Sequence, residues 1–163
     1  MSEYQYFESR NIDGLKKKIL EFNEQLKAEN NPNQLIEKNL LQLENVFKLI
    51  SNTSTYHSST LSQNELEIIT VKISSWPRQY NLAFFDLLRM FALHPQADSL
   101  FTNVDCGLNY FIMFCGALMN EDSSDVIRAL VLRLLCNLFT GTAARYALFK
   151  HYKFIIDCLE KLG

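Results

Sequence analysis

The stretch that decides the fold is VIRALVLRLLCNLFTG, residues 126–141. It predicts a helix that is apolar on nearly every face, interrupted by Arg128, Arg133 and Asn137 and ended by Gly141. A helix of this composition is buried on most sides, which is typical of a core helix in an all-helical domain. Because a buried guanidinium needs a partner, the two arginines either reach an open edge or form bonds inside the domain.

The composition is that of one folded domain. A chain of 163 residues can bury a sizeable core, and its 48 % apolar and 21 % charged residues are ordinary for a globular protein. The net charge of −2 gives no overall attraction to nucleic acid or to an anionic membrane. The apolar runs are too short to span a membrane, and residues 1–11 lack the apolar segment of a secretory signal. We therefore expect a soluble protein of the cytoplasm and nucleus.

The four cysteines are expected to be reduced. None forms a CxxC pair and each lies in an apolar run, so buried thiols of a cytosolic or nuclear protein are favoured over metal ligands or disulfides. These residues are Cys106, Cys115, Cys136 and Cys158. The sequence predicts no metal and no cofactor.

Apolar periodicity predicts helices along the whole chain and no strand. Ser62 and Glu65 form a capping-box pattern, and the proline dipeptides at 76–77 and 94–95 end helices. The predicted helices are 13–27, 34–51, 63–75, 78–93, 106–119, 124–140, 142–150 and 152–162, with one short turn at 97–101. Their predicted core-facing residues include Leu15, Ile19, Phe22, Leu26, Ile36, Leu40, Leu43, Phe47, Ile50, Leu66, Ile69 and Ile73. The aromatic segment at residues 1–11 is expected to dock on the first helices.

The helices repeat at a fixed interval. Leu88-Arg89 and Leu132-Arg133 stand 44 residues apart in matching helix phase, and the helix at 36–51 lies one further interval upstream. A period near this length, with two or three helices per unit, is the signature of armadillo and HEAT repeats. We therefore predict that residues 1–163 form a single all-α domain, an armadillo/HEAT-like right-handed helical solenoid of about three repeats. In such a stack, one edge of the inner helices lines a concave groove.

Three motifs also resemble a known family. They are FESRNIDGLKKKILEFN (7–23), SSWPRQYNLAFFDLLRMFALHPQADSLF (74–101) and VLRLLCNLFTG (131–141). In this order they are similar to the PUL domain of the phospholipase-activating protein (PLAA) family, over nearly the whole chain. The resemblance implies an armadillo-like stack whose basic groove holds the C-terminal tail of the valosin-containing AAA+ ATPase. It implies a cofactor in ubiquitin-dependent protein degradation and ubiquitin homeostasis, and no catalysis.

The resemblance has a further implication for the extent of the domain. The family's domain continues through further repeats, whereas this chain ends at Leu162-Gly163. We therefore expect the N-terminal portion of a PUL domain. Ubiquitin-pathway proteins are expected to bind through other parts of the full-length protein.

A peptide tail with free carboxylates favours arginines, which hold a carboxylate bidentately, and asparagines, which bond an extended backbone. We therefore predict that Arg89, Arg133 and Asn137 line the peptide-binding groove. The alternative is internal ion pairing, with Arg89 bound to Asp86 at i, i+3, or Arg133 bound to a carboxylate of a neighbouring repeat. Secondary candidates for the groove are Arg128, Arg145, Lys150 and Lys153.

No motif of a known catalytic class occurs in the sequence, which lacks a Gly-rich phosphate loop, HExxH, GxSxG and a close pair of loop carboxylates. His94 and His151, each at a predicted helix end, are expected to cap the last carbonyls, and His57 lies in a polar loop. The sequence thus predicts a non-catalytic peptide-binding module. Two alternatives stay open: a helical-repeat scaffold for an unrelated partner, and a lipid- or phospholipase-regulating domain whose basic amphipathic helix would be 13–27.

Overall fold

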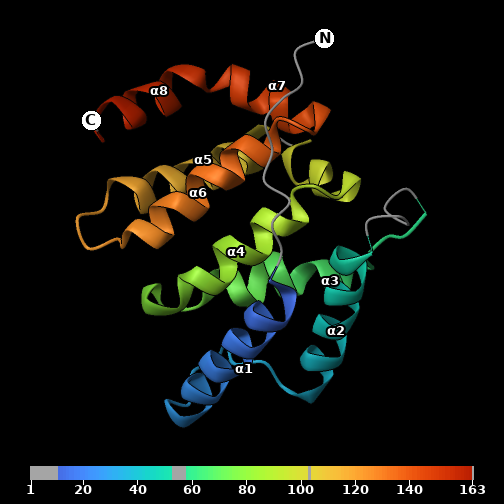
Figure 1. The fold of residues 1–163 in the computed structure, drawn as a ribbon. Helices are drawn as coiled ribbons and strands as arrows, with labels where there is room; N and C mark the ends of the chain where they lie inside the picture. The colour runs from blue at the N-terminus through green and yellow to red at the C-terminus, as the bar shows by residue number, and fades with distance from the viewer. Residues whose placement is uncertain (1–10, 53–57, 103, 163) are drawn as a thin grey trace. The chain divides into compact units, whose positions relative to one another are not determined.

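The computed structural model describes residues 11–52, 58–102 and 104–162, with the backbone alone for 104–107. Every regular element among these residues is a helix, which confirms the all-α prediction (Figure 1). The chain divides into two compact units, residues 9–90 and residues 91–163. The aromatic segment was predicted at residues 1–11, and its residues 1–10 lie outside the described residues. His57 also lies outside them.

The unit of residues 9–90 joins regular α-helices through tighter and wider helical turns. Its elements are α1 (Ile12–Ala28), α2 (Glu37–Ser51), α3 (Gln63–Glu67), a π-helical turn (Ile68–Lys72), two 3-10 turns (Ile73–Ser75 and Arg78–Tyr80) and α4 (Asn81–Phe91). The continuous helices predicted at 63–75 and 78–93 are therefore each subdivided. The division at residues 76–77 is as predicted, because Pro77 has no N–H to continue the helix.

Helix α1 begins at a side-chain cap. The Asn11 Oδ1 accepts a hydrogen bond from the Gly14 N–H at 2.9 Å, which satisfies one free amide of the first turn. The predicted core stripe of α1 is buried at three of its four positions. These are Leu15, Ile19 and Leu26. Phe22 is half-buried, and its ring centroid lies 5.0 Å from that of Tyr80.

The linker between α1 and α2 is fixed by a buried amide. Asn23 is fully buried on α1; its Nδ2 donates to the Leu35 carbonyl at 2.9 Å and its Oδ1 accepts from the Leu35 N–H at 2.6 Å. One side chain thus satisfies both backbone groups of a linker residue, which burial would otherwise leave unpaired. The side chain of Leu35 is held in the core at 0 % exposure.

Two aromatic residues hold the same linker. The Trp76 indole N–H donates to the Asn33 carbonyl at 2.9 Å, and the Tyr80 hydroxyl donates to the Glu29 carboxylate at 3.0 Å. Both rings are buried, so each polar tip has the partner that burial requires. The Trp-Pro motif therefore ends one helix and ties it to a linker more than 40 residues earlier in the sequence.

The predicted core position at Ile36 is wrong. Ile36 is 58 % exposed, because it is the N-cap residue of α2 and its neighbour Leu35 takes the place in the core. The Ile36 N–H donates to the Asn39 Oδ1 at 3.2 Å, which closes the first turn. The helix therefore begins at Glu37 rather than at residue 34. The other predicted core residues of α2 are buried or half-buried.

The capping box predicted at Ser62 and Glu65 is confirmed. The Glu65 carboxylate accepts from the Ser62 N–H and hydroxyl, both at 2.8 Å, and from the Asn45 amide of α2 at 2.6 Å. Burial raises the pKa of Glu65, but these hydrogen bonds stabilise the carboxylate more and bring its pKa below the ordinary value. The same carboxylate thus caps α3 and joins it to α2.

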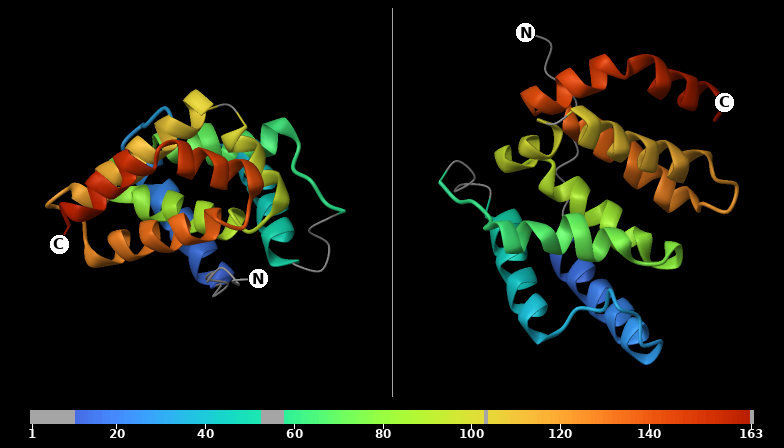
Figure 2. Two further views of the ribbon diagram at one scale, coloured as in Figure 1. Left: turned by 90° about the horizontal axis from the view of Figure 1, so that it is seen from above. Right: turned by 180° about the vertical axis from the view of Figure 1, so that it is seen from behind.

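In the unit of residues 91–163 a 3-10 segment precedes the α-helices. Its elements are a 3-10 segment (Pro95–Phe101), α5 (Val104–Met119), α6 (Asp125–Leu138), α7 (Thr142–Lys150) and α8 (Tyr152–Glu160). Helix α5 packs against both α6 and α8 (Figure 2). The ends of these α-helices lie within two residues of the predicted ones, because local signals such as Ser124 and Gly141 set them.

The start of α7 is held by a carboxylate from the 3-10 segment. Asp98 accepts from the N–H groups of Ala143 at 2.9 Å and Ala144 at 2.8 Å, where a helix has free amides and a positive dipole end. A Cβ at Gly141 would overlap this carboxylate. Gly141 has φ −87°, so glycine is needed here for the close approach and not for a left-handed conformation.

Helix α6 is buried on one side only. Ser124 caps it by accepting from the Ile127 N–H at 3.3 Å. Its buried residues are Ile127, Leu130, Val131, Leu134, Leu135, Asn137 and Leu138. Val126 and Leu132 are 56 % and 41 % exposed. Burial is therefore confined to one face, narrower than the expected burial on most sides, because an apolar residue does not by itself mark a buried face.

The predicted interval is present in the helix starts. Helices α2, α4 and α6 begin at Glu37, Asn81 and Asp125, so that each lies 44 residues after the one before. The solenoid arrangement of these helices stays a prediction. In the described residues no single helix is long and apolar enough to span a membrane; α6 and α7 reach the length and composition only as a pair, bent by 113°.

Replacing Asn23 with alanine is expected to destabilise the protein by about 2–4 kcal/mol, because both backbone groups of Leu35 lose a buried partner. Asn23→Asp should cost about as much, since it places a carboxylate against the Leu35 carbonyl. Gln25→Ala, on the exposed face of the same helix, is the control and should change stability by less than about 0.5 kcal/mol. Urea unfolding followed by circular dichroism measures the differences. Equal stability of the Asn23→Ala and Gln25→Ala proteins would show that the linker does not depend on this amide.

The contact between Asp98 and Gly141 predicts non-additive mutations. Asp98→Ala should cost about 1–2 kcal/mol through the lost helix cap, and Gly141→Ala at least as much through steric overlap. In the double variant the new Cβ meets no carboxylate, so its cost should fall at least about 0.5 kcal/mol below the sum of the single costs. Unfolding of the four proteins completes the cycle. Additive costs would contradict the close approach.

Candidate functional site

Arg89, the first predicted groove residue, is buried in an ion pair. Its Nε and Nη2 donate to the Asp86 Oδ1 at 2.9 and 2.6 Å, one helical turn earlier on α4. Arg89 is 4 % exposed, and the Asp86 side chain is 20 % exposed. The structure therefore shows the internal pair that the sequence offered as the alternative to a groove position.

Arg133 and Asn137, the other two predicted groove residues, do not share an exposed edge. Arg133 is exposed on α6, next to the exposed Leu132. Asn137 lies one turn further along the helix and is fully buried. Of the three first candidates, only Arg133 presents its side chain to solvent.

The residue one turn before each arginine differs. Arg89 follows Asp86 at i, i+3, whereas the matching residue before Arg133 is Leu130. A carboxylate at this spacing lets the arginine stay inside the protein as a pair, and a leucine does not. The 44-residue interval therefore predicts equivalent positions along the chain but not equivalent environments.

Arg128, a secondary candidate, closes the end of a neighbouring helix. Its Nε donates to the Leu118 carbonyl at 3.3 Å and its Nη2 to the Asn120 carbonyl at 3.0 Å. These carbonyls lie at the C-terminus of α5, where a helix has no internal donors left. A weaker contact joins Arg128 to Asp125 at 3.4 Å. Arg128 thus connects α6 to α5.

The remaining secondary candidates lie on α7 and α8. Arg145 is half-exposed, and its Nη2 approaches the Thr142 hydroxyl at 3.5 Å. Lys150 and Lys153 are exposed at the end of α7 and the start of α8. Together with Arg133 they form the set of cationic candidates that solvent reaches in the unit of residues 91–163.

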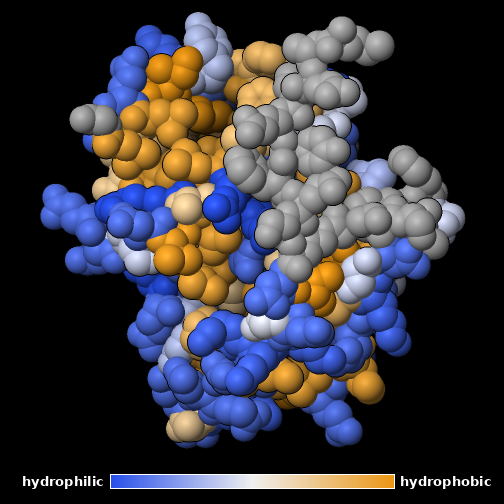
Figure 3. Space-filling model, in the orientation of Figure 1, coloured by the Kyte–Doolittle hydropathy of each residue, from blue (hydrophilic) through white to orange (hydrophobic). Residues whose placement is uncertain are grey.

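The same two helices expose large apolar side chains, which sequence reasoning missed. The exposed apolar residues of α7 and α8 are Tyr146, Phe149, Tyr152, Phe154, Ile156 and Leu159. Figure 3 shows hydrophobic surface over α8. Contiguous exposure of this kind marks an interaction surface on a folded protein. In residues 152–162 the polar side chains, Lys153, Asp157, Glu160 and Lys161, share one helical face, so apolar side chains fill the rest of the helix surface, more than one core-facing stripe takes up.

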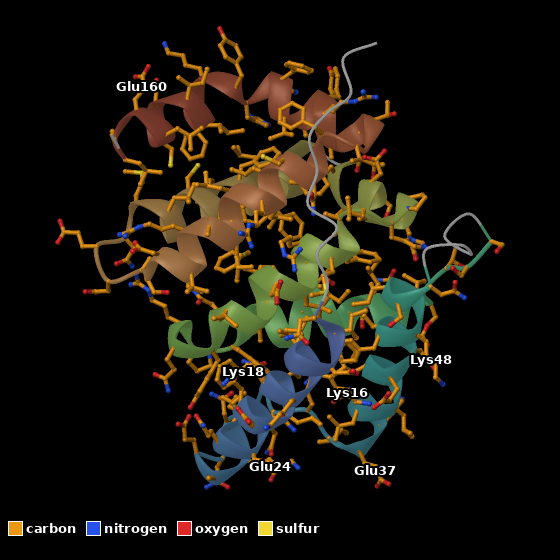
Figure 4. The ribbon with its side chains drawn as sticks, in the orientation of Figure 1. Lys16, Lys18, Glu24, Glu37, Lys48 and Glu160 are labelled. Carbon is orange, nitrogen blue, oxygen red and sulfur yellow. The ribbon has the colours of Figure 1, made fainter. Side chains whose placement is uncertain are left out.

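The lysines of α1 lie among acidic residues. The ion pairs are Lys16–Glu44 at 2.5 Å, Lys18–Glu21 at 3.1 Å and Lys27–Glu24 at 2.6 Å. Figure 4 shows Lys16, Lys18 and Glu24 on the surface of this helix. The outer face of α1 is therefore of mixed charge, as expected for a solvated helix, and not a continuous basic face.

The histidines do not cap the helix ends as predicted. The His94 ring accepts at Nδ1 from the Gln96 N–H at 3.1 Å, so it caps the start of the next segment rather than the carbonyls before it. His151 ends α7 through its backbone N–H, which donates to the Ala147 carbonyl at 3.1 Å. Its Nε2 is buried and has no hydrogen-bond partner among the described residues.

The described cysteines are free thiols in helices. The Cys158 Sγ of α8 lies 3.7 Å from the Cys115 carbonyl of α5. Burial, with the hydrogen bond and charge of Cys158, raises the pKa of the Cys115 thiol to about 12. Because the thiolate is the reactive form, this thiol is a poor nucleophile near neutral pH. No group of three or more possible metal ligands occurs in the part of the chain that the structure describes.

The fold and the exposed residues together define a helical interaction module. The model of the PUL domain family matches residues 1–163, so the chain belongs to the PUL domain family. This confirms the family resemblance, and the PUL domain is a helical protein-interaction module. A comparison with curated proteins finds no match.

Because Arg89 is buried in an ion pair, we predict that replacing it lowers the stability of the protein. Arg89→Met keeps the aliphatic volume but leaves the Asp86 carboxylate without its guanidinium, so it should cost about 2–4 kcal/mol. Arg78→Met, at an exposed position before the same helix, is the matched control and should stay within about 0.5 kcal/mol of wild type. Urea unfolding gives both values. An Arg89→Met protein as stable as the Arg78→Met protein would return Arg89 to the groove candidates.

Proposed function

We propose that this PUL domain is a non-catalytic module that binds the C-terminal tail of the valosin-containing AAA+ ATPase. The binding links the ATPase to ubiquitin-dependent protein degradation and ubiquitin homeostasis, in the cytoplasm and nucleus. The observation that carries the proposal is the family match over the whole chain. The family resemblance implies a tail-binding role. A helical protein-interaction module is consistent with that role.

The exposed cations support an acidic or carboxylate-ended ligand. Arg133, Lys150 and Lys153 lie on α6, α7 and α8 of one unit and reach solvent. A guanidinium holds a carboxylate through two parallel N–H donors, and an ammonium adds a point charge. Each exposed ion pair contributes only about 0–1 kcal/mol, so several contacts and the neighbouring apolar side chains have to act together.

Calorimetry with a synthetic peptide of the ATPase tail tests the proposal. We expect saturable binding with a Kd of about 10–100 μM, corresponding to roughly −6 kcal/mol. Arg133→Glu should weaken it at least about tenfold, because charge reversal replaces an attraction with a repulsion. Lys17→Glu, at an exposed position on α1 in the other unit, makes the same charge change and should leave the affinity unchanged.

The outcomes of the titration distinguish a failure of the proposed function from a failure of the residue assignment. No heat with the wild-type chain at about 1 mM peptide would overturn tail binding and favour a scaffold for an unrelated partner. Binding that Arg133→Glu and Lys17→Glu weaken equally would overturn only the assignment of Arg133. Folding of each variant is checked by circular dichroism before the titration.

A second candidate function is a lipid-regulating domain, favoured by one observation. The exposed aromatic side chains Tyr146, Phe149 and Tyr152 lie beside the exposed Lys150 and Lys153. Aromatic and basic residues on one surface are the composition that binds an anionic membrane interface. Co-sedimentation with phosphatidylserine vesicles tests it, with phosphatidylcholine vesicles as the control. Equal recovery in both pellets removes this candidate.

A further inference from the structure

A groove on the unit of residues 9–90 is lined by none of the candidates above. It is formed by the first turns of α2 and by α3 with the π-helical turn that follows, and its volume is about 310 Å³. Such a volume lies at the lower end of the range of ligand sites and holds one or two side chains. All its lining residues belong to the described part of this one unit.

The groove exposes two aliphatic side chains. Ile36 is 58 % exposed on the α2 side, and Val71 is 52 % exposed on the other side. Ile68 also lines the groove but is 1 % exposed, so its side chain belongs to the core. A partner side chain seated between Ile36 and Val71 would remove this apolar surface from water.

The wall that carries Val71 is a π-helical turn. A π turn inside a helix is uncommon and is frequently found at functional sites. Its geometry is fixed by hydroxyl groups: Ser75 donates to the Val71 carbonyl at 2.6 Å and Ser74 to the Thr70 carbonyl at 2.7 Å. The turn is therefore specified by the local sequence and presents Val71 in a defined position.

The charges of the groove select an acidic partner. Lys38 and Lys72 line it from its two walls and form no ion pair among the described residues, unlike Lys16, which pairs with Glu44. The acidic residue of the lining, Glu67, already accepts a hydrogen bond from a glutamine amide at 3.1 Å. Two unpaired ammonium groups beside exposed aliphatic side chains are complementary to carboxylates beside an apolar side chain.

Side-chain amides complete the lining. Asn39 donates from Nδ2 to the Gln42 Oε1 at 3.3 Å, which turns the Gln42 amide into part of a short polar row along α2. Asn64 adds a third amide from α3. Amide groups both donate and accept, so they can bond the backbone of an extended peptide.

We propose that the groove between α2 and the π-helical turn binds an extended acidic peptide segment of a partner protein. One bulky apolar side chain of the segment sits between Ile36 and Val71, and flanking carboxylates pair with Lys38 and Lys72. This site shares no residue with the proposed tail-binding residues of α6–α8, so the domain would carry two peptide-binding sites of different composition.

Fluorescence anisotropy with three labelled, end-capped peptides tests the site on the whole chain. The probes are EDFDE, EDGDE without the apolar anchor, and KRFRK with reversed charge. EDFDE should bind with saturation below about 1 mM, EDGDE at least about tenfold more weakly, and KRFRK without saturation. Equal binding of EDFDE and EDGDE, or no saturable binding of EDFDE, overturns the proposal.

Matched variants localise the binding. The double variant Lys38→Glu/Lys72→Glu should abolish EDFDE binding, and Val71→Asp should weaken it at least about tenfold. The control Lys17→Glu/Lys48→Glu makes the same charge change at exposed positions outside the groove of the same unit and should bind as wild type. Equal losses in both double variants would mean that only net charge attracts the peptide, which contradicts the site. The result does not depend on the ATPase tail, whose binding is tested separately through Arg133.

Discussion

A polar group that folding buries has to be hydrogen-bonded, and this constraint decides how the helices of the domain are joined. An unpaired buried donor or acceptor costs about 1–3 kcal/mol, a large fraction of a domain's stability. Asn23 meets the constraint by bonding both backbone groups of Leu35, which fixes the linker after α1. Asp98 meets it at the first amides of α7, and the Arg89–Asp86 pair meets it inside α4. Apolar burial gives these helices their stability, and the polar contacts give them their connections.

The same constraint separates residues of the interior from residues of the surface. The position that recurs every 44 residues carries Asn45, Arg89 and Arg133. Asn45, although exposed, joins α2 to α3 through the Glu65 carboxylate, and Arg89 is buried against the Asp86 carboxylate, so both serve the fold. Arg133 is exposed. A repeat in the sequence thus keeps the helix phase but not the environment of the position, and a ligand contacts the repeat only where the side chain remains accessible.

Much of the fold could be predicted because its signals are local. The Ser62–Glu65 capping box, the break at residues 76–77 and the stop at Gly141 each involve residues within one turn of each other. The contacts that join elements could not be predicted. The amide of Asn23 bonds a residue 12 positions later in the sequence, and Asp98 bonds residues 45 and 46 positions later. No local sequence pattern marks contacts at these separations. The environments of the candidate site residues were predicted less well than the fold. Residue type identified the cations, but the apolar residues around α6 gave no indication of which flank would be exposed.

Substitutions of interior residues and of surface residues affect binding in different ways. A change at Asn23, Asp98 or Arg89 acts on every surface at once, because it lowers the population of folded protein on which any binding depends. A change at an exposed residue such as Val71 or Arg133 removes contacts with a ligand and leaves the buried hydrogen bonds in place. Loss of binding therefore identifies a binding residue only when the free energy of unfolding is unchanged. By this criterion the residue type of an arginine in an apolar helix does not decide whether it is structural or functional; the free energy of unfolding of its variant does.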